Sequence, residues 1–162
     1  MNILNVSELI TLQAKEHPNR KSISEPIFKN GDYAYNSYTF TELENQINRI
    51  CNMLISKGIK KGDKVLFFVK PNLDFCAITF ALFRMGATSV FIDPGMKKKY
   101  FFECIKDLKP DAIIGIPAVH SLHLRSPVGS LSGSASWLIT KLNGDFEILL
   151  KLNKKVWKRQ GG

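Results

Sequence analysis

The stretch that decides the fold is residues 64–93, which read KVLFFVKPNLDFCAITFALFRMGATSVFID. Its first run, Val65–Val69, is continuously apolar, as expected of a parallel strand that is buried on both faces. A proline and an asparagine open the next segment, which has helical periodicity and closes at a glycine. Ser89–Ile92 is a second apolar run, so the stretch predicts strand, helix and strand of one sheet. The helix residues expected to face inward are Phe75, Ile78, Thr79, Leu82 and Phe83.

The same alternation continues downstream of this stretch. A further helix is expected, and Pro110 ends it; residues 111–116 then form a third apolar strand. A β-α-β-α-β succession is typical of a parallel sheet with right-handed crossovers and helices packed on it. The inner face predicted for this helix consists of Tyr100, Phe101, Cys104, Ile105 and Leu108.

Upstream, the pattern predicts a short helix and a β-hairpin. The helix ends at His17-Pro18-Asn19, and two strand-like runs, 21–28 and 33–40, flank Asn30-Gly31-Asp32. Asn-Gly is a strong hairpin signal because both residues tolerate positive φ. Pro26 indicates that the first strand is irregular or lies at an edge. The apolar face expected of the helix comprises Val6, Leu9, Ile10 and Ala14.

The helix between the hairpin and the sheet has the clearest boundaries. Thr41 is expected to cap it, and Glu44, three residues later, completes a capping box. Gly58 follows the last turn as a C′ residue. The fold class is therefore α/β, with a hairpin followed by a β-α-β-α-β unit. The apolar stripe of this helix is Leu43, Ile47, Ile50, Cys51 and Leu54.

The composition of the chain changes after residue 120. Residues 121–136 contain six serines together with Pro127 and two glycines, which is typical of a linker. Residues 137–142 are expected to form a strand, and residues 145–158 a basic amphipathic helix.

Bulk properties indicate one soluble globular domain in a reducing compartment. The chain has 162 residues, of which 44% are hydrophobic, and its mean hydropathy is −0.06. No apolar run is long enough to span a bilayer, and no secretory signal is visible, so we expect no transmembrane segment. Three cysteines without a CxxC pair favour the cytoplasm. The net charge of +9 is scattered, which favours a solvated surface over a specific nucleic-acid partner.

No catalytic constellation emerges from residue types and spacing. There is no GxGxxG after the first buried strand and no Walker-type phosphate loop. His17, His120 and His123 lack partners at metal-ligand spacing. We therefore name no catalytic residue and no metal ligand, and cofactor-binding residues stay unassigned. The three cysteines lie on apolar helix stripes and are interpreted as core residues: Cys51, Cys76 and Cys104.

Several motifs nevertheless resemble a known family. Tyr38-Thr39-Phe40-Thr41-Glu42-Leu43, then Asn48-Arg49, then residues 58–65 (GIKKGDKV) are similar to the N-terminal signature of the AMP-dependent synthetases and ligases, the adenylate-forming superfamily. A finer resemblance, to fatty-acyl-CoA-ligase-like members including olefin β-lactone synthetases, rests on Asp93-Pro94-Gly95-Met96 and residues 115–120. The resemblance covers residues 3–120 and implies an N-terminal subdomain fragment there. Composition indicates a linker-like segment over 121–136 and a basic tail over 137–162.

The resemblance implies two-step chemistry for a full-length protein. A carboxylate such as a fatty acid reacts with ATP, in the presence of Mg²⁺, to give an acyl-adenylate, and the acyl group then passes to coenzyme A or another acceptor. The family's phosphate loop has its nearest counterpart in residues 130–137, which lack its second glycine, its proline and its lysine. We therefore expect no tight binding of ATP or Mg²⁺ by this chain.

Three hypotheses follow for the chain as a whole. The first is a partial acyl-adenylate-forming ligase that is inactive alone. The second is a non-catalytic interaction domain, or half of a split ligase that needs a partner chain. The third is a basic protein that binds nucleic acid or a membrane surface through Lys151–Arg159.

Overall fold

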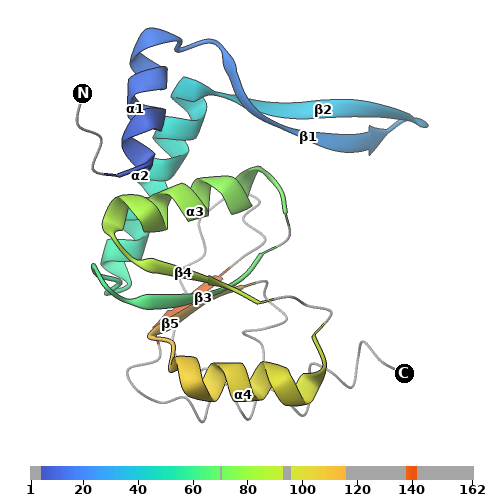
Figure 1. The fold of residues 1–162 in the computed structure, drawn as a ribbon. Coiled ribbons are helices and arrows are strands. Elements are labelled where there is room, and N and C mark those ends of the chain that lie inside the picture. Colours follow the sequence, from blue (N-terminus) through green and yellow to red (C-terminus); the bar gives the residue numbers. More distant parts are fainter. Residues whose placement is uncertain (1–4, 70, 93–95, 116–137, 142–162) are drawn as a thin grey trace. The chain divides into compact units, whose positions relative to one another are not determined.

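The computed structural model describes residues 5–69, 71–92, 96–115 and 138–141. The chain divides into two compact units: residues 1–56 with 70–86, and residues 57–69 with 87–162. No helix in the described ranges is long and apolar enough to cross a membrane. The elements, labelled in Figure 1, are α1 Ser7–Glu16, β1 Lys21–Lys29, β2 Asp32–Thr39, α2 Phe40–Ser56, β3 Lys64–Phe68, α3 Leu73–Met85, β4 Thr88–Phe91, α4 Lys98–Leu108, β5 Ala112–Gly115 and β6 Leu138–Lys141.

The predicted hairpin is confirmed as β1 and β2 of the first unit. Its turn consists of Asn30 at φ 56° and Gly31 at φ 85°, the two positive φ values that a tight two-residue connection requires. The strands are antiparallel and place Phe28 opposite Tyr33. Figure 1 shows the hairpin as a two-stranded arm that extends away from α1 and α2.

The capping box predicted for α2 was wrong by two residues. The Thr39 backbone N–H donates to Glu42 Oε2 at 2.8 Å, and the Glu42 N–H donates to Thr39 Oγ1 at 3.2 Å. The cap is therefore Thr39 with Glu42, because β2 runs directly into the helix and Thr41 already lies inside it. Glu44 is left available for another contact. The predicted apolar stripe is confirmed, since Leu43, Ile47, Ile50, Cys51 and Leu54 are all buried.

Helix α3 has the predicted ends but a different buried face. Asn72 Oδ1 accepts the Phe75 N–H at 2.9 Å, and Gly86 closes the helix at φ 68°. Phe75 and Phe83, expected inside, are only half-buried. Small residues allow a close approach to α2, as the Cys51 Sγ contact with the Ala81 carbonyl at 3.7 Å shows. The buried residues of α3 are Leu73, Ala77, Ile78, Ala81 and Leu82.

The second unit contains a four-stranded sheet in the order β4-β3-β5-β6. Strands β4 and β5 run parallel to β3, as predicted, while β6 is antiparallel to β5. Strand β6 thus confirms the strand expected within residues 137–142. Helix α4 packs on the sheet through Ile105, which forms a buried cluster with Leu66 and Ile113. Tyr100, expected on the inner face of α4, is 52% exposed.

The turn that leads into β3 explains the glycines of the family-like signature. Gly58 and Gly62 adopt φ values of 78° and 87°, which other residues rarely adopt. Between them, the buried Asp63 accepts the Lys60 N–H through Oδ2 at 3.0 Å, and its own carbonyl accepts the Thr88 N–H at 2.8 Å. This part of the signature is therefore a backbone requirement of the fold.

Candidate functional site

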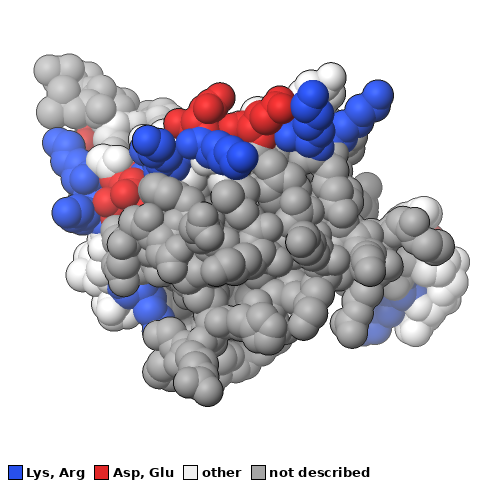
Figure 2. All heavy atoms as spheres, turned by 90° about the horizontal axis from the view of Figure 1, so that it is seen from below, with Lys and Arg blue, Asp and Glu red and all other residues white. Residues whose placement is uncertain are grey.

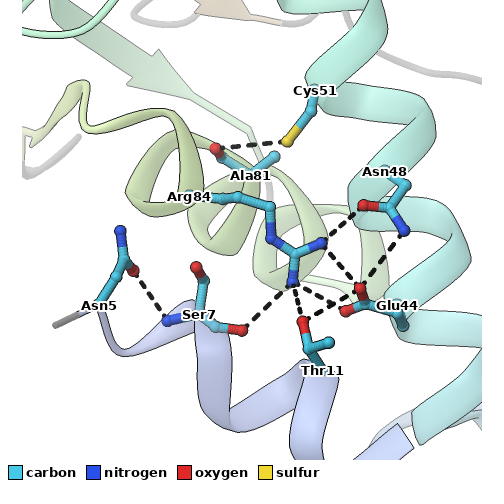
Figure 3. Close-up of polar contacts among 8 residues, drawn as sticks. All are labelled: Asn5, Ser7, Thr11, Glu44, Asn48, Cys51, Ala81 and Arg84. Carbon is cyan, nitrogen blue, oxygen red and sulfur yellow. Dashed lines mark hydrogen bonds and ion pairs between the residues drawn. The ribbon is translucent and has the colours of Figure 1, made fainter. Parts of the chain in front are cut away.

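A polar cluster of the first unit surrounds Arg84, at the last turn of α3 (Figure 3). One terminal nitrogen donates to Glu44 Oε1 at 3.0 Å and to Asn48 Oδ1 at 2.7 Å. The other donates to Glu44 Oε2 at 2.8 Å, to Thr11 Oγ1 at 3.0 Å and to the Ser7 carbonyl at 3.2 Å. Arg84 thus joins α1, α2 and α3.

This cluster is a structural tie. The two terminal nitrogens of an arginine carry four N–H groups, and all of them are engaged by groups of the same unit. The Arg84 and Glu44 side chains are only 21% and 16% exposed. Neither terminal nitrogen therefore has an N–H left to donate to a ligand. Because α1 docks through the polar side that carries Ser7 and Thr11, its predicted apolar face is partly wrong, and Val6 and Leu9 are 49% and 40% exposed.

Sequence reasoning missed this tie because Glu44 had been assigned to the cap. A signal was present: Glu44 and Asn48 are four residues apart, so they share one face of α2, and their side chains are in contact. Arg84 lies near the end of the largely apolar α3, and an arginine is rarely buried without a partner such as a carboxylate.

The position that best suits a ligand lies in the second unit, at the carboxyl ends of β3, β4 and β5. These strands are parallel, so their carboxyl ends meet at one edge. The order β4-β3-β5 places the first of the three strands in the middle, which makes the boundary between β3 and β5 a topological switch point. Open α/β sheets bind ligands at such a point. There the last pair is Phe68 opposite Gly115.

The segments that follow these strand ends lie outside the described residues. His120, His123, the loop at 130–137 and the basic tail Lys151–Arg159 all fall there, so their expected roles stay predictions. Within the described ranges, no three His, Cys, Asp or Glu side chains are grouped so that they could hold a metal ion. We derive no catalytic step from the described residues.

The titratable groups with shifted pKa values do not form a catalytic set. Burial, followed by the nearby Asp74 and Glu25 carboxylates, raises the pKa of Tyr38. Burial also raises the pKa of the Cys51 and Cys76 thiols, which makes both poor nucleophiles at neutral pH. Cys51 is a core residue as predicted, but Cys76 is only half-buried. Cys104 is exposed, so its assignment to the core was wrong: α4 turns it away from Ile105 and the sheet.

Exposed basic and acidic side chains lie close together on α4. On α4, the exposed Lys99, Glu103, Lys106 and Asp107 lie within nine residues of each other. Figure 2 likewise shows blue and red side chains next to each other in its largest coloured group. A nucleic-acid surface requires a patch of one sign, and α4 does not supply one.

Comparison with known proteins gives the family. The model of the AMP-binding enzyme family matches residues 10–151 of the chain. The chain is 32% identical over 118 residues to an olefin β-lactone synthetase from Xanthomonas campestris, covering 71% of this chain and 21% of that protein. It is 26% identical over 110 residues to long-chain fatty acid transport protein 6 of Mus musculus, covering 66% of this chain and 17% of that protein. The chain belongs to the AMP-binding enzyme family of adenylate-forming ligases.

Solved structures of this family share the fold. The fatty acid AMP ligase from Legionella pneumophila superposes with a TM-score of 0.62 at 22% identity, over 75% of this chain and 21% of that chain. The N-terminal domain of FACL13 from Mycobacterium tuberculosis gives a TM-score of 0.59 at 20% identity, over 68% of this chain and 26% of that chain. The chain thus spans about a fifth of the length of the olefin β-lactone synthetases that it matches. The family match extends beyond residue 120, to residue 151.

Proposed function

We propose that this chain is part of an acyl-adenylate-forming ligase and does not form an acyl-adenylate alone. The observation that carries the proposal is the family match over residues 10–151, combined with coverage of about a fifth of the matched relatives. ATP-using enzymes of this family activate a carboxylate for transfer, and the whole reaction requires phosphate-binding and charge-stabilising groups. We propose that these groups come from residues other than those that the structure describes.

We propose that the described residues form part of the scaffold that surrounds the active site of the whole enzyme. The sheet of the second unit presents the edge at Phe68 and Gly115, and the Arg84 tie keeps the helices of the first unit together. We propose a fatty acid as the carboxylate substrate and coenzyme A or another acceptor as the acyl recipient. The support is the similarity to an olefin β-lactone synthetase and to a fatty acid AMP ligase. We also propose a cytoplasmic location.

A pyrophosphate-release assay tests the claim of inactivity. The chain is incubated with ATP, Mg²⁺ and a panel of fatty acids of different lengths, with an active acyl-adenylating enzyme as positive control. We expect no release above the background without protein. Carboxylate-dependent turnover by the isolated chain would refute the proposal.

A second candidate is half of a split ligase that a partner chain completes. The observation that favours it is again the one-fifth coverage of the matched relative. Restoration of pyrophosphate release on adding a separately expressed remainder of the Xanthomonas relative would favour this candidate. Salt-sensitive binding to DNA or anionic vesicles, lost on deleting residues 145–162, would instead favour the basic-tail hypothesis.

A further inference from the structure

Two side chains from distant parts of the sequence cap the first turn of α3. The first N–H groups of a helix have no acceptor inside it, so other groups must accept them. The Phe75 N–H donates to Oδ1 of Asn72, the residue just before the helix, at 2.9 Å. The Leu73 N–H donates to Oε2 of Glu25 on β1, 48 residues earlier in the sequence, at 2.7 Å. The start of α3 is therefore completed by the hairpin.

Glu25 lies at the outer limit of the half-buried part of its hairpin face. Residues two apart along a strand share a face, so Ile23, Glu25 and Ile27 lie on the same side of β1. Ile23 and Glu25 are half-buried, whereas Ile27 is exposed. On β2, Tyr38 is half-buried, and Asn36, which is directly opposite Glu25, is exposed. The buried part of this face thus ends at Glu25.

The charge of Glu25 suits this position. A carboxylate at the first turn of a helix interacts favourably with the helix dipole, and a charged acceptor forms a stronger hydrogen bond than a neutral one. Burial and then Glu25 raise the pKa of the Cys76 thiol on α3. Glu25 also contributes, after burial and Asp74, to the raised pKa of Tyr38 on β2. The carboxylate thus lies within electrostatic reach of both β2 and α3.

We propose that Glu25 is a latch that couples the outer part of the hairpin, residues 26–36, to the first turn of α3, so that both open together. Residues 26–36 are all exposed, and segments with few buried contacts are the ones that open locally in native proteins. The base of the hairpin is held separately, because the Phe40 N–H donates to the Arg20 carbonyl at 3.0 Å. Breaking the latch should therefore free the outer hairpin and the start of α3 and leave α2 in place.

Hydrogen exchange of the full chain, followed by mass spectrometry of its peptides, tests the coupling. Glu25→Ala removes the acceptor, so exchange should become at least about threefold faster both in peptides within residues 23–37 and in a peptide over residues 72–77. Glu25→Gln keeps an acceptor oxygen but loses the charge, so its exchange should fall between that of the wild type and that of Glu25→Ala. Peptides within residues 43–54 of α2 should exchange as in the wild type.

The matched control is Asn36→Ala, because Asn36 is directly opposite Glu25 and exposed. It should exchange like the wild type in both segments, and circular dichroism verifies that every variant is folded. Unchanged exchange in Glu25→Ala would overturn the proposal, as would faster exchange in the hairpin alone or an equal effect of Asn36→Ala. An equal acceleration in α2 would also overturn it, because it indicates a general loss of stability. No readout depends on adenylation activity, so the inference and the proposed function fail independently.

Discussion

Arg84 illustrates how one residue organises the first unit. Its guanidinium bridges three helices, and its bidentate contact with Glu44 has the geometry that an arginine forms with a carboxylate and a lysine cannot. An exposed contact of this kind contributes little to the free energy of unfolding. Breaking it costs more where both groups are largely buried, because removing one partner leaves the other charge without compensation.

Replacing Arg84 by methionine should lower the free energy of unfolding by about 2–3 kcal/mol, because Glu44 is left largely buried without its partner. Arg84→Lys should recover only part of that loss. The measurement is urea denaturation followed by circular dichroism. Arg49→Met is the control, because Arg49 is exposed and its hydrogen bond to Gln46 is long, at 3.5 Å, so its effect should stay within about 0.5 kcal/mol. Equal effects of the two methionine variants would contradict the tie.

Glu42 gives the α2 cap a pH dependence. Hydrogen bonds from the Thr39 backbone N–H and then from its hydroxyl hold the pKa of Glu42 below its ordinary value. A lowered folded-state pKa stabilises the fold above the ordinary carboxyl pKa, and this contribution is lost as the pH falls through the folded-state value. The wild type should therefore be more stable than Glu42→Gln at pH 7, and the difference should disappear in strong acid. Chemical denaturation of both proteins at several pH values measures it, and a difference that persists unchanged in acid would argue against the cap.

The thiols should differ in reactivity. Cys104 is exposed, while burial raises the pKa of Cys51 and so reduces its thiolate fraction. With an aromatic disulfide reagent at pH 7.5, Cys104 should react at least about tenfold faster than Cys51. Cys104→Ser should remove the fast phase. A fast phase that remains in this variant and disappears in Cys51→Ser would contradict the burial of Cys51.

At the scale of elements, the helices and strands follow from periodicity, but their ends and faces depend on tertiary contacts. The strands β3, β4 and β5 each lie within one residue of the predicted ends, because continuous apolar runs identify them. The α2 cap was predicted two residues too late, because Thr39 and Thr41 each stand three residues before a glutamate. Only the continuation of β2 up to Thr39 decides between them. The inner faces of α3 and α4 depend on which neighbour each helix meets, which local sequence does not specify.

The cap assignment makes a discriminating prediction for α2. Thr39→Ala should lower the free energy of unfolding by about 1 kcal/mol, because the Glu42 N–H loses its acceptor. Thr41→Ala should be nearly neutral, since Thr41 is exposed within the first turn. Thermal and urea denaturation of the pair measure the difference. The reverse order of effects would place the cap at Thr41.

For the whole molecule, the family could be predicted from the sequence, whereas the catalytic residues could not. The signature around residues 38–65 indicated the family, and in this chain its glycines, Asp63 and Glu42 satisfy backbone requirements of the turn into β3 and of the α2 cap. The same reasoning found no catalytic group, and the Arg84 tie escaped it because residues 40 positions apart are brought together only by packing. Motifs that build the scaffold thus reveal ancestry without locating chemistry.

The central claim is that this chain forms part of an adenylate-forming ligase whose phosphate chemistry is supplied by other residues. The most direct measurement is pyrophosphate release by a chimera in which residues 10–115 of this chain replace the matching segment of the Xanthomonas olefin β-lactone synthetase. The account predicts carboxylate-dependent release by the chimera and none by the isolated chain. A folded chimera without release, under conditions in which the parent enzyme is active, would contradict the account.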